Sequence, residues 1–366
     1  DGLSGIAVTN LGHAHPRVTA AIEAQARRFV HCSNIFRIDA QEQAGEALVA
    51  RAGMERVFFS NSGAEANEAA IKIARLHAHQ RDVSEPKVVV LEGAFHGRTL
   101  ATLTASGNRR IQAGFEPLVS GFIRAPRNDL AALEAIAERN QGIAALMLEP
   151  VQGESGIHLL DRDYLAGAAR LCRERGWLLI FDEVQSGNGR TGSYFYYQQT
   201  GTVPDIVTTA KALGNGVPIG ACIARGAAAE TFAPGHHGST YGGNPLACAA
   251  AVAVLETLAG DTPPETADPV GDALMGAFDA ALDHPEAAVD RRRAGLMIGI
   301  ELAFACPELA GKALEAGLLL NVTADRTLRL LPPLVMSEAQ AARFGATLAG
   351  VVNAWWEARA TLPGAA

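Results

Sequence analysis

Two neighbouring stretches decide how this chain folds: WLLIFDEVQSGNGRTG, residues 177–192, and DIVTTAKALGNG, residues 205–216. Each begins with an apolar run of the length of a buried strand. The first run ends at a carboxylate, Asp182, and the second ends at Lys211. In an open parallel α/β sheet, ligands bind in the crevice beyond the carboxyl ends of the strands. We therefore expect Asp182 and Lys211 to face the same crevice.

A carboxylate and a lysine presented together, with no metal-ligand spacing nearby, suit one chemistry particularly well. The lysine can form an imine with a cofactor aldehyde. The carboxylate can keep a pyridine nitrogen protonated, so that the ring withdraws electrons from a substrate carbanion. A pyridoxal phosphate enzyme needs this arrangement. A structural ion pair at a sheet edge uses the same residue types and is the commoner arrangement on spacing alone, so the rest of the chain has to decide.

The composition is that of an ordinary globular protein. Of the 366 residues, 48% are hydrophobic and 19% charged, and the formal net charge is −8. This charge disfavours a general nucleic-acid or acidic-membrane surface. The five cysteines are scattered and form no CxxC pair, which favours reduced thiols and a cytoplasmic protein. No apolar run reaches the roughly 20 residues of a membrane span, and we expect no metal site.

Strand-like and helix-like stretches alternate from about residue 55 to 225, which predicts a mainly parallel sheet flanked by crossover helices. A linker-like passage, GDTPPETADP at 260–269, interrupts this pattern, and strand-like segments such as LMIGIELA and TLRLLPPLV follow it. They indicate a second, smaller α/β unit. We expect three segments: 1–35 as the N-terminal part of the small domain, 36–258 as the large cofactor-binding domain, and 259–366 as the C-terminal small domain.

Several loops that follow predicted strands carry polar residues. SNSGAEANEAA, residues 60–70, places Gly63 at the start of a helix, where free N–H groups and the helix dipole suit a phosphate. A capped helix that binds nothing would look the same. EGAFHGRTL, residues 92–100, offers Phe95 to stack on a flat ring and Arg98 to grip a carboxylate. A core Phe95 and a surface ion pair of Arg98 are equally compatible with this stretch.

Two further loops are less specific. LEPVQGESG, residues 148–156, ends a strand with Glu149 and Glu154, but their spacing in sequence does not fix the spacing in space that glycosidase chemistry requires. Glu149 could be purely structural, and Arg329 is a possible partner for either acid. HHGSTYGGNP, residues 236–245, is a glycine-rich loop that could contact phosphate or serve only as a connection.

Taken together and in this order, the motifs resemble those of the class III aminotransferases, which are fold-type I enzymes dependent on pyridoxal 5'-phosphate. The resemblance runs through nearly the whole chain, including GIAVTNLGHAHPRV, FFSNSGAEANEAAIK, LIFDEVQSGNGRTG, TTAKALGNGVPIGA and HGSTYGGNPLACAA. Several ordered motifs are far more specific than any one of them. GxxxxGK[ST] is missing, which argues against a P-loop nucleotide enzyme. The intact Lys211 and Asp182 argue against a non-catalytic binding module.

The resemblance implies a role for each candidate residue. Lys211 would bind the cofactor aldehyde and later shuttle a proton, and Asp182 would pair with the pyridinium nitrogen. Arg98 would grip a substrate α-carboxylate, and Ser239 would be a second substrate contact. The remaining implied cofactor contacts are Ser62, Gly63 and Ala64 at the phosphate, Phe95 as the stacking ring, His96, Val184 and Gln185 beside the ring, and Thr240, which would reach the phosphate of a neighbouring subunit.

The implied reaction is transamination of N-acetylornithine with 2-oxoglutarate, giving N-acetylglutamate 5-semialdehyde and glutamate in arginine biosynthesis. Glu154 and Arg329 would form a pair in which the glutamate masks the arginine for one substrate and releases it for the dicarboxylate. Succinylornithine, succinyldiaminopimelate, ornithine and 4-aminobutyrate are the alternative amino donors. A homodimer with shared active sites is implied, without nucleic acid or membrane.

Two residues depart from the family pattern. Asn188 stands where the family usually has an apolar residue, which is expected to alter packing near the cofactor. Arg293 replaces a glycine that is common before GLMIGIEL and puts the local turn in question.

Overall fold

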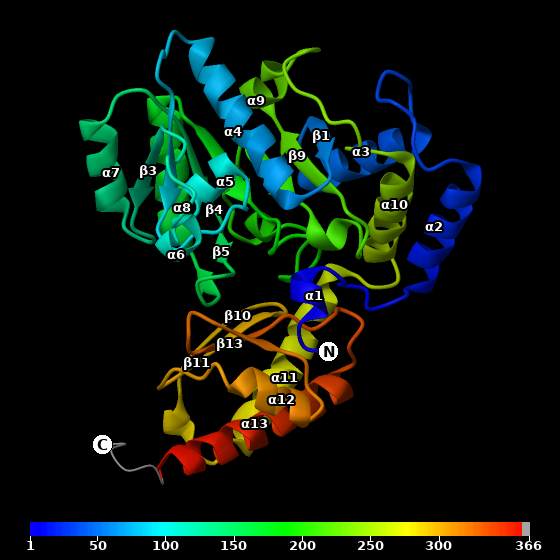
Figure 1. Ribbon diagram of the computed structural model, residues 1–366, viewed down its shortest axis with the longest axis vertical. Coiled ribbons are helices and arrows are strands. Elements are labelled where there is room, and N and C mark those ends of the chain that lie inside the picture. Colours follow the sequence, from blue (N-terminus) through cyan, green and yellow to red (C-terminus); the bar gives the residue numbers. More distant parts are fainter. Residues whose placement is uncertain (361–366) are drawn as a thin grey trace.

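A seven-stranded sheet forms the centre of the larger part of the molecule (Figure 1). The computed structural model describes residues 1–360. The strand order is β1-β9-β8-β7-β4-β2-β3, and neighbours from β8 to β3 are parallel, whereas β9 runs antiparallel to both β8 and β1. This confirms the expected mainly parallel sheet. The strands are β1 (Arg56–Ser60), β2 (Lys87–Leu91), β3 (Phe122–Ala125), β4 (Ile143–Leu148), β7 (Leu178–Asp182), β8 (Ile206–Thr209) and β9 (Gly220–Ala224).

Side chains of the central strands point alternately to the two faces of the sheet, and each face is apolar. In β2, Val88 and Val90 belong to one apolar cluster with residues of α4, whereas Val89 and Leu91 belong to the other. This two-residue period, with both faces buried, explains why the central strands are continuous apolar runs. The helices of this part are α2 (Pro16–Arg28), α3 (Asp39–Ala52), α4 (Gly63–His79), α5 (Leu100–Ala105), α6 (Arg109–Gln112), α7 (Leu130–Arg139), α8 (Arg162–Arg175), α9 (Gly226–Thr231) and α10 (Pro245–Ala259).

A smaller part lies below the large sheet in Figure 1 and is built on a four-stranded antiparallel sheet of order β10-β11-β13-β12. The start of the chain joins it, since Gly2 N donates to Leu319 O (2.8 Å) and Leu331 N donates to Gly2 O (2.6 Å). Both ends of the chain therefore contribute to this part. Its elements are α1 (Ser4–Ala7), α11 (Ala267–Ala281), β10 (Ala288–Ala294), β11 (Met297–Leu302), α12 (Leu309–Glu315), β12 (Asn321–Thr323), β13 (Thr327–Leu330) and α13 (Glu338–Ala360).

Short elements complete the chain. The 3₁₀ helices are η1 (Tyr196–Gln199), η2 (Lys211–Leu213), η3 (Pro264–Thr266) and η4 (Pro285–Ala287), and a two-stranded ribbon pairs β5 (Val151–Gln152) with β6 (His158–Leu159). Arg293 does not disturb the turn between β10 and β11, because Gly295 supplies the left-handed residue (φ 55°). The guanidinium of Arg293 instead donates to Asp268 O (3.1 Å) and pairs with Asp272, tying β10 to α11.

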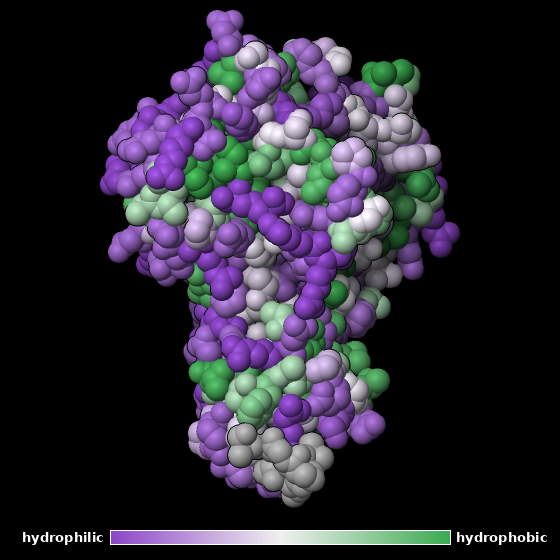
Figure 2. Space-filling model, turned by 60° about the vertical axis from the view of Figure 1, so that its left-hand side comes forward, coloured by the Kyte–Doolittle hydropathy of each residue, from purple (hydrophilic) through white to green (hydrophobic). Residues whose placement is uncertain are grey.

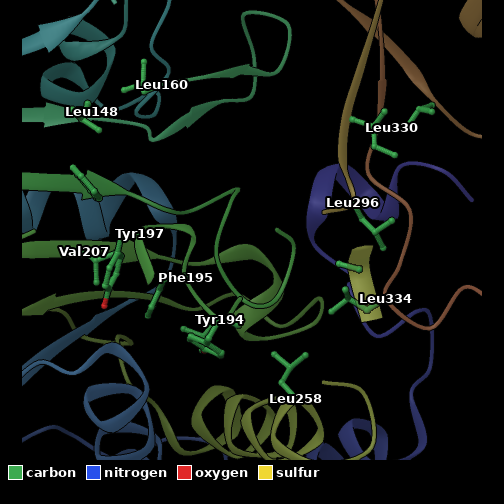
Figure 3. Packing of buried hydrophobic residues seen from close by; sticks show 14 of the residues in the cluster. Leu148, Leu160, Tyr194, Phe195, Tyr197, Val207, Leu258, Leu296, Leu330 and Leu334 are labelled. Carbon is green, nitrogen blue, oxygen red and sulfur yellow. The ribbon is translucent and has the colours of Figure 1, made fainter. Parts of the chain in front are cut away.

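One apolar cluster continues from the large sheet into the small one. Figure 3 shows Leu148 and Val207 on the side of the large sheet, Tyr194 and Leu258 between, and Leu330 on the other side. Because the two parts share this cluster, their relative position is fixed by packing as well as by the connecting chain.

The expected domain boundaries after residues 35 and 258 remain a prediction. Helix α2, within 1–35, packs against α10 beside the large sheet (Figure 1). Residues 361–366 of the expected C-terminal domain lie outside the described residues. Among residues 1–360, no single helix has the length and apolarity to cross a membrane, and one bent pair, Pro245–Ala259 with Pro264–Ala281, meets those two criteria only jointly.

Candidate active site

A cavity of about 400 Å³ lies at the carboxyl ends of the parallel strands. Strands β7 and β8 are adjacent and parallel, with Asp182 opposite Thr208, and Lys211 lies two residues after the end of β8. Asp182 and Lys211 therefore share the cavity, as the strand ends predicted. Ten of the fourteen residues singled out from the sequence line it: Ser62, Gly63, Ala64, Phe95, His96, Arg98, Asp182, Val184, Gln185 and Lys211.

Lys211 is held in an unusual backbone conformation. Its φ is +46°, in the left-handed region, and it begins the short helix η2. Such a conformation costs on the order of 1–3 kcal/mol for a residue with a side chain and persists only where the surroundings enforce it. Burial lowers the pKa of the Lys211 ammonium, against the opposing effects of Asp182, Glu154 and Glu149. A lowered pKa makes the neutral, nucleophilic amine available at lower pH.

The Asp182 carboxylate is fixed by three partners. Oδ2 accepts a hydrogen bond from Asn67 Nδ2 (2.7 Å) and lies 2.8 Å from His96 Nδ1, while Oδ1 accepts from Val184 N (3.0 Å). Thr208 Oγ1 in turn donates to Asn67 Oδ1 (2.7 Å), which orients the amide. Burial works against a charged imidazole, but the hydrogen bond and charge of Asp182 raise the pKa of His96 above its usual value. The site thus keeps a buried carboxylate in a fixed orientation.

The N-terminus of α4 forms one end of the cavity. Ser62 caps the helix by accepting from Glu65 N (3.2 Å), and Glu65 Oε2 accepts from Asn61 N (2.6 Å). A Cβ at Gly63 would come within 2.7 Å of Val184, so the chain approaches the 182–185 segment closely only because Gly63 has no side chain. The first N–H groups of this 17-residue helix have no partner within the helix and favour an anion.

Glu149 organises the opposite wall. Its carboxylate accepts from Phe95 N (2.8 Å) and Gly153 N (3.4 Å) and so fixes the loop that carries Phe95. The guanidinium of Arg98 lies 5.5 Å from the centre of the Phe95 ring. Burial raises the pKa of Glu149 to about 7, with His96 opposing and Asp182 adding to the rise.

Glu154 lines a second cavity, of about 490 Å³, which shares Phe95 and Arg98 with the first. Arg329 is buried on β13, and its Nη1 lies 2.6 Å from Glu154 Oε1. Its Nε donates to Asn321 Oδ1 (3.1 Å). The two residues are thus paired from opposite parts of the molecule.

Ser239 and Thr240 lie on the loop before α10 and do not line the main cavity. Ser239 is nevertheless tied to it, because its Oγ accepts from Asn61 Nδ2 (3.2 Å), and Asn61 lines the cavity. Thr240 is exposed. Within this single chain, the structure brings Ser239 to the margin of the site and leaves Thr240 on the surface.

Pyridoxal 5'-phosphate fits these residues. Among the described residues, His96 Nε2 and Gln185 Oε1 are buried polar atoms of the cavity lining without a hydrogen-bond partner, as expected where a polar ligand is to be received. The α4 N-terminus would hold the phosphate, Asp182 the ring nitrogen and Lys211 the aldehyde. Phe95 and Val184 line the space as apolar residues that a flat ring can contact.

The sequence reasoning missed Asn67 and Thr208 and left Glu149 without a role. Asn67 is a buried polar residue on a helical face that is otherwise apolar, with Ala66 and Ala70 as neighbours. Thr208 is a buried hydroxyl in the strand that leads to Lys211. A buried polar group requires a hydrogen-bond partner. A polar residue that interrupts an apolar stretch is therefore the feature of the sequence that could have identified Asn67 and Thr208.

Comparisons with known proteins agree with this site. The family described as aminotransferase class-III matches residues 1–352. The acetylornithine aminotransferase of Nitrosomonas europaea is 46% identical over 98% of this chain and 91% of its own. Acetylornithine aminotransferase 1 of Bordetella bronchiseptica is 48% identical over 93% of this chain and 87% of its own.

Solved structures show the same fold. An ornithine aminotransferase from Toxoplasma gondii, described with partial occupancy of PLP at its active site, has a TM-score of 0.94 at 33% identity and covers 99% of this chain and 87% of that one. The N-acetylornithine aminotransferase of Stenotrophomonas maltophilia has a TM-score of 0.84 at 35% identity, with 97% and 90% covered.

Proposed function

We propose a specific reaction for this chain, which belongs to the class III aminotransferases. It transfers the amino group of N-acetylornithine to 2-oxoglutarate, with pyridoxal 5'-phosphate as cofactor. The observation that carries this proposal is the buried cavity at the ends of two adjacent parallel strands, which holds both Lys211 and the clamped Asp182. The similarity to acetylornithine aminotransferases over more than nine tenths of the chain supports the choice of donor. We assign it to arginine biosynthesis and to the cytoplasm.

The residues of the chain have distinct tasks in this reaction. When bound, the cofactor supplies an electron sink for the substrate carbanion. Asp182 holds the proton on the ring nitrogen, because Asn67, His96 and Val184 keep its carboxylate fixed. Lys211 would hold the cofactor aldehyde and, as a general base, would take the proton from the substrate carbon. Arg98 holds the substrate α-carboxylate with its two parallel N–H groups.

The Glu154–Arg329 pair accounts for two different substrates in one site. With N-acetylornithine the arginine stays paired with Glu154, as in the present structure at 2.6 Å. With glutamate or 2-oxoglutarate the arginine binds the second carboxylate instead. The partial exposure of Glu154 supports this exchange, because the glutamate can swing into solvent whereas the buried arginine cannot.

An Arg329→Ala substitution is expected to act mainly on the dicarboxylate half-reaction. Removing one partner of a buried charge pair costs about 2–5 kcal/mol, so kcat/KM for 2-oxoglutarate should fall about thirtyfold or more. The half-reaction with N-acetylornithine, followed by single-turnover spectroscopy, should change much less. The control is Arg139→Ala, an exposed arginine at the end of α7. Full activity of Arg329→Ala with glutamate would refute the exchange.

A homodimer with shared sites is part of the proposal. The exposed apolar side chains Phe29, Ile35, Phe36 and Tyr241 gather where the 29–36 segment meets the loop that carries Thr240. The rings of His31 and Tyr241 are 5.3 Å apart, and Asn34 donates to two carbonyls of that loop. Other apolar groups also interrupt the mostly hydrophilic surface of the larger part in Figure 2. A second copy would bury this surface and bring Thr240 to its neighbour's phosphate.

Sedimentation equilibrium tests the dimer. The chain should sediment with twice its own mass, and the double substitution of Ile35 and Phe36 by aspartate should yield a monomer with weakened cofactor binding. The reason is that two charges would have to be buried at the interface. A wild-type monomer that retains cofactor and full activity would eliminate the shared site.

Comparison of amino donors tests the substrate assignment. N-acetylornithine, N-succinylornithine, ornithine and 4-aminobutyrate are each to be assayed with 2-oxoglutarate and ranked by kcat/KM. We expect N-acetylornithine to lead. A lead by another donor would reject the assignment to N-acetylornithine while leaving the transaminase site in place.

A further inference from the structure

Asn188 lies outside the cavity lining, yet it contacts the main chain next to Lys211. It is 1% exposed and sits in the segment that connects β7 to η1. Its Nδ2 donates to Ala210 O (3.1 Å) and to Thr209 Oγ1 (2.9 Å). The Ala210 carbonyl belongs to the peptide group that leads into Lys211. The carboxamide therefore acts on the peptide plane that precedes the strained lysine.

The carboxamide and the main-chain carbonyl of Asn188 all have hydrogen-bond partners. Its Oδ1 accepts from Tyr194 Oη (2.9 Å), and its main-chain carbonyl accepts from Asn10 Nδ2 (3.0 Å). Arg190 donates to Asn10 Oδ1 and to Leu296 O (3.2 Å), which extends the network to the small sheet. The side chain of Asn188 is consequently held by the larger part of the molecule, whereas its main-chain carbonyl is held by Asn10.

Asparagine suits this position for two separate reasons. The backbone φ of residue 188 is +55°, a region that asparagine tolerates better than most residues. The carboxamide also offers two donor hydrogens and an acceptor, and the position uses both kinds. An apolar residue would leave the Ala210 carbonyl without this donor, and an aspartate would oppose it with a second acceptor.

We infer that Asn188 is a positioning residue for the proposed transamination, in which its carboxamide fixes the Ala210–Lys211 peptide and so keeps the lysine amine at its place in the cavity. The left-handed conformation of Lys211 requires such an external constraint. Leu213 N also donates to Ala210 O (3.0 Å), so that one carbonyl is held by the 3₁₀ helix on one side and by Asn188 on the other. The inference rests on the proposed function only for its kinetic consequence.

An Asn188→Gly substitution tests this role, because glycine accepts the left-handed backbone without strain and removes only the carboxamide. In the holoenzyme, kcat for N-acetylornithine should fall about tenfold to a hundredfold, because a small misplacement of a reacting group has an effect of this size. KM should change less than about twofold. Asn188→Asp should lower kcat in the same direction, because it keeps the acceptor for Tyr194 but not the donor for Ala210. The Asn188→Asp variant also provides the test if the glycine variant fails to fold.

A second readout needs no cofactor. In the cofactor-free protein, the rate at which acetic anhydride modifies Lys211, measured by mass spectrometry across pH, reports the pKa of its amine. In the Asn188→Gly variant the Lys211 amine should be better solvated. The pH midpoint of its modification should therefore move up towards that of an exposed lysine. The charged groups that act on Lys211 are Asp182, Glu154, Glu149 and Arg329, and none is altered by the substitution.

Asn128→Gly is the matched control. Asn128 is also left-handed (φ 56°), and its side chain likewise joins two segments, accepting from Asp161 N (3.0 Å) and contacting Leu159 O, but it does not line the cavity. Its loss should lower thermal stability alone. If Asn188→Gly and Asn188→Asp behave like this control, with kcat and the Lys211 midpoint unchanged, the positioning role is overturned. A wild-type chain without transaminase activity would reject the proposed function, while the Lys211 midpoint would still test the positioning.

Discussion

Replacement of Lys211 by alanine is expected to lower kcat/KM with N-acetylornithine by at least about a thousandfold. The substitution removes both a nucleophile and a general base, and general acid–base catalysis alone contributes about 10²–10⁴. No other lysine lines the cavity, as far as residues 1–360 show, so no neighbour can replace the amine. The measurement is the steady-state rate together with the visible absorbance of the bound cofactor, which should lose the band that depends on Lys211.

The control for this experiment is Lys312→Ala, which removes an exposed lysine on α12. Its activity and spectrum should match those of the unaltered protein. The two outcomes separate the competing interpretations of the strand-end residues. A Lys211→Ala protein that keeps its activity would show that Lys211 has no catalytic role.

An Asp182→Asn substitution is expected to reduce kcat about a hundredfold to a thousandfold, the size of effect seen when one preorganised electrostatic contact is removed. The amide has nearly the shape of the carboxylate but cannot keep a ring nitrogen protonated. Where the new side chain places its NH₂ group towards the Asn67 amide, two donors face each other. The hydrogen bond from Asn67 is then lost unless one of the amides rotates. Cofactor affinity should therefore fall as well, as measured by equilibrium dialysis.

Asp205→Asn provides the comparison for Asp182→Asn. Asp205 precedes the neighbouring strand, and its Oδ2 accepts from Leu179 N (2.8 Å) at the amino ends of the strands, away from the cavity. This change should cost some stability without a comparable loss of kcat. Equal kcat losses in the two variants would mean that Asp182 acts only through the stability of the sheet.

Much of this site was predictable because local pattern fixes where strands end. Apolar runs of strand length located β7 and β8, and the topology rule for parallel sheets placed Asp182 and Lys211 at one edge. The ordered motifs then gave the family, which the comparison with aminotransferase class-III confirms. The individual site roles remain predictions, with the ten cavity-lining residues as their structural support.

Local patterns along the chain suffice to predict the fold class, the edge of the sheet that carries the chemistry and the residue types available there. How those residues are held depends on contacts between distant segments. Asn67 and His96 come from separate crossover connections and meet at Asp182 only when the sheet is assembled, and Thr208 of β8 then holds the Asn67 amide. Asn188 looked like a departure from the family pattern, yet it reaches the peptide before Lys211. Spacing along the chain sets local structure, but hydrogen bonds between distant segments depend on distances that only packing fixes.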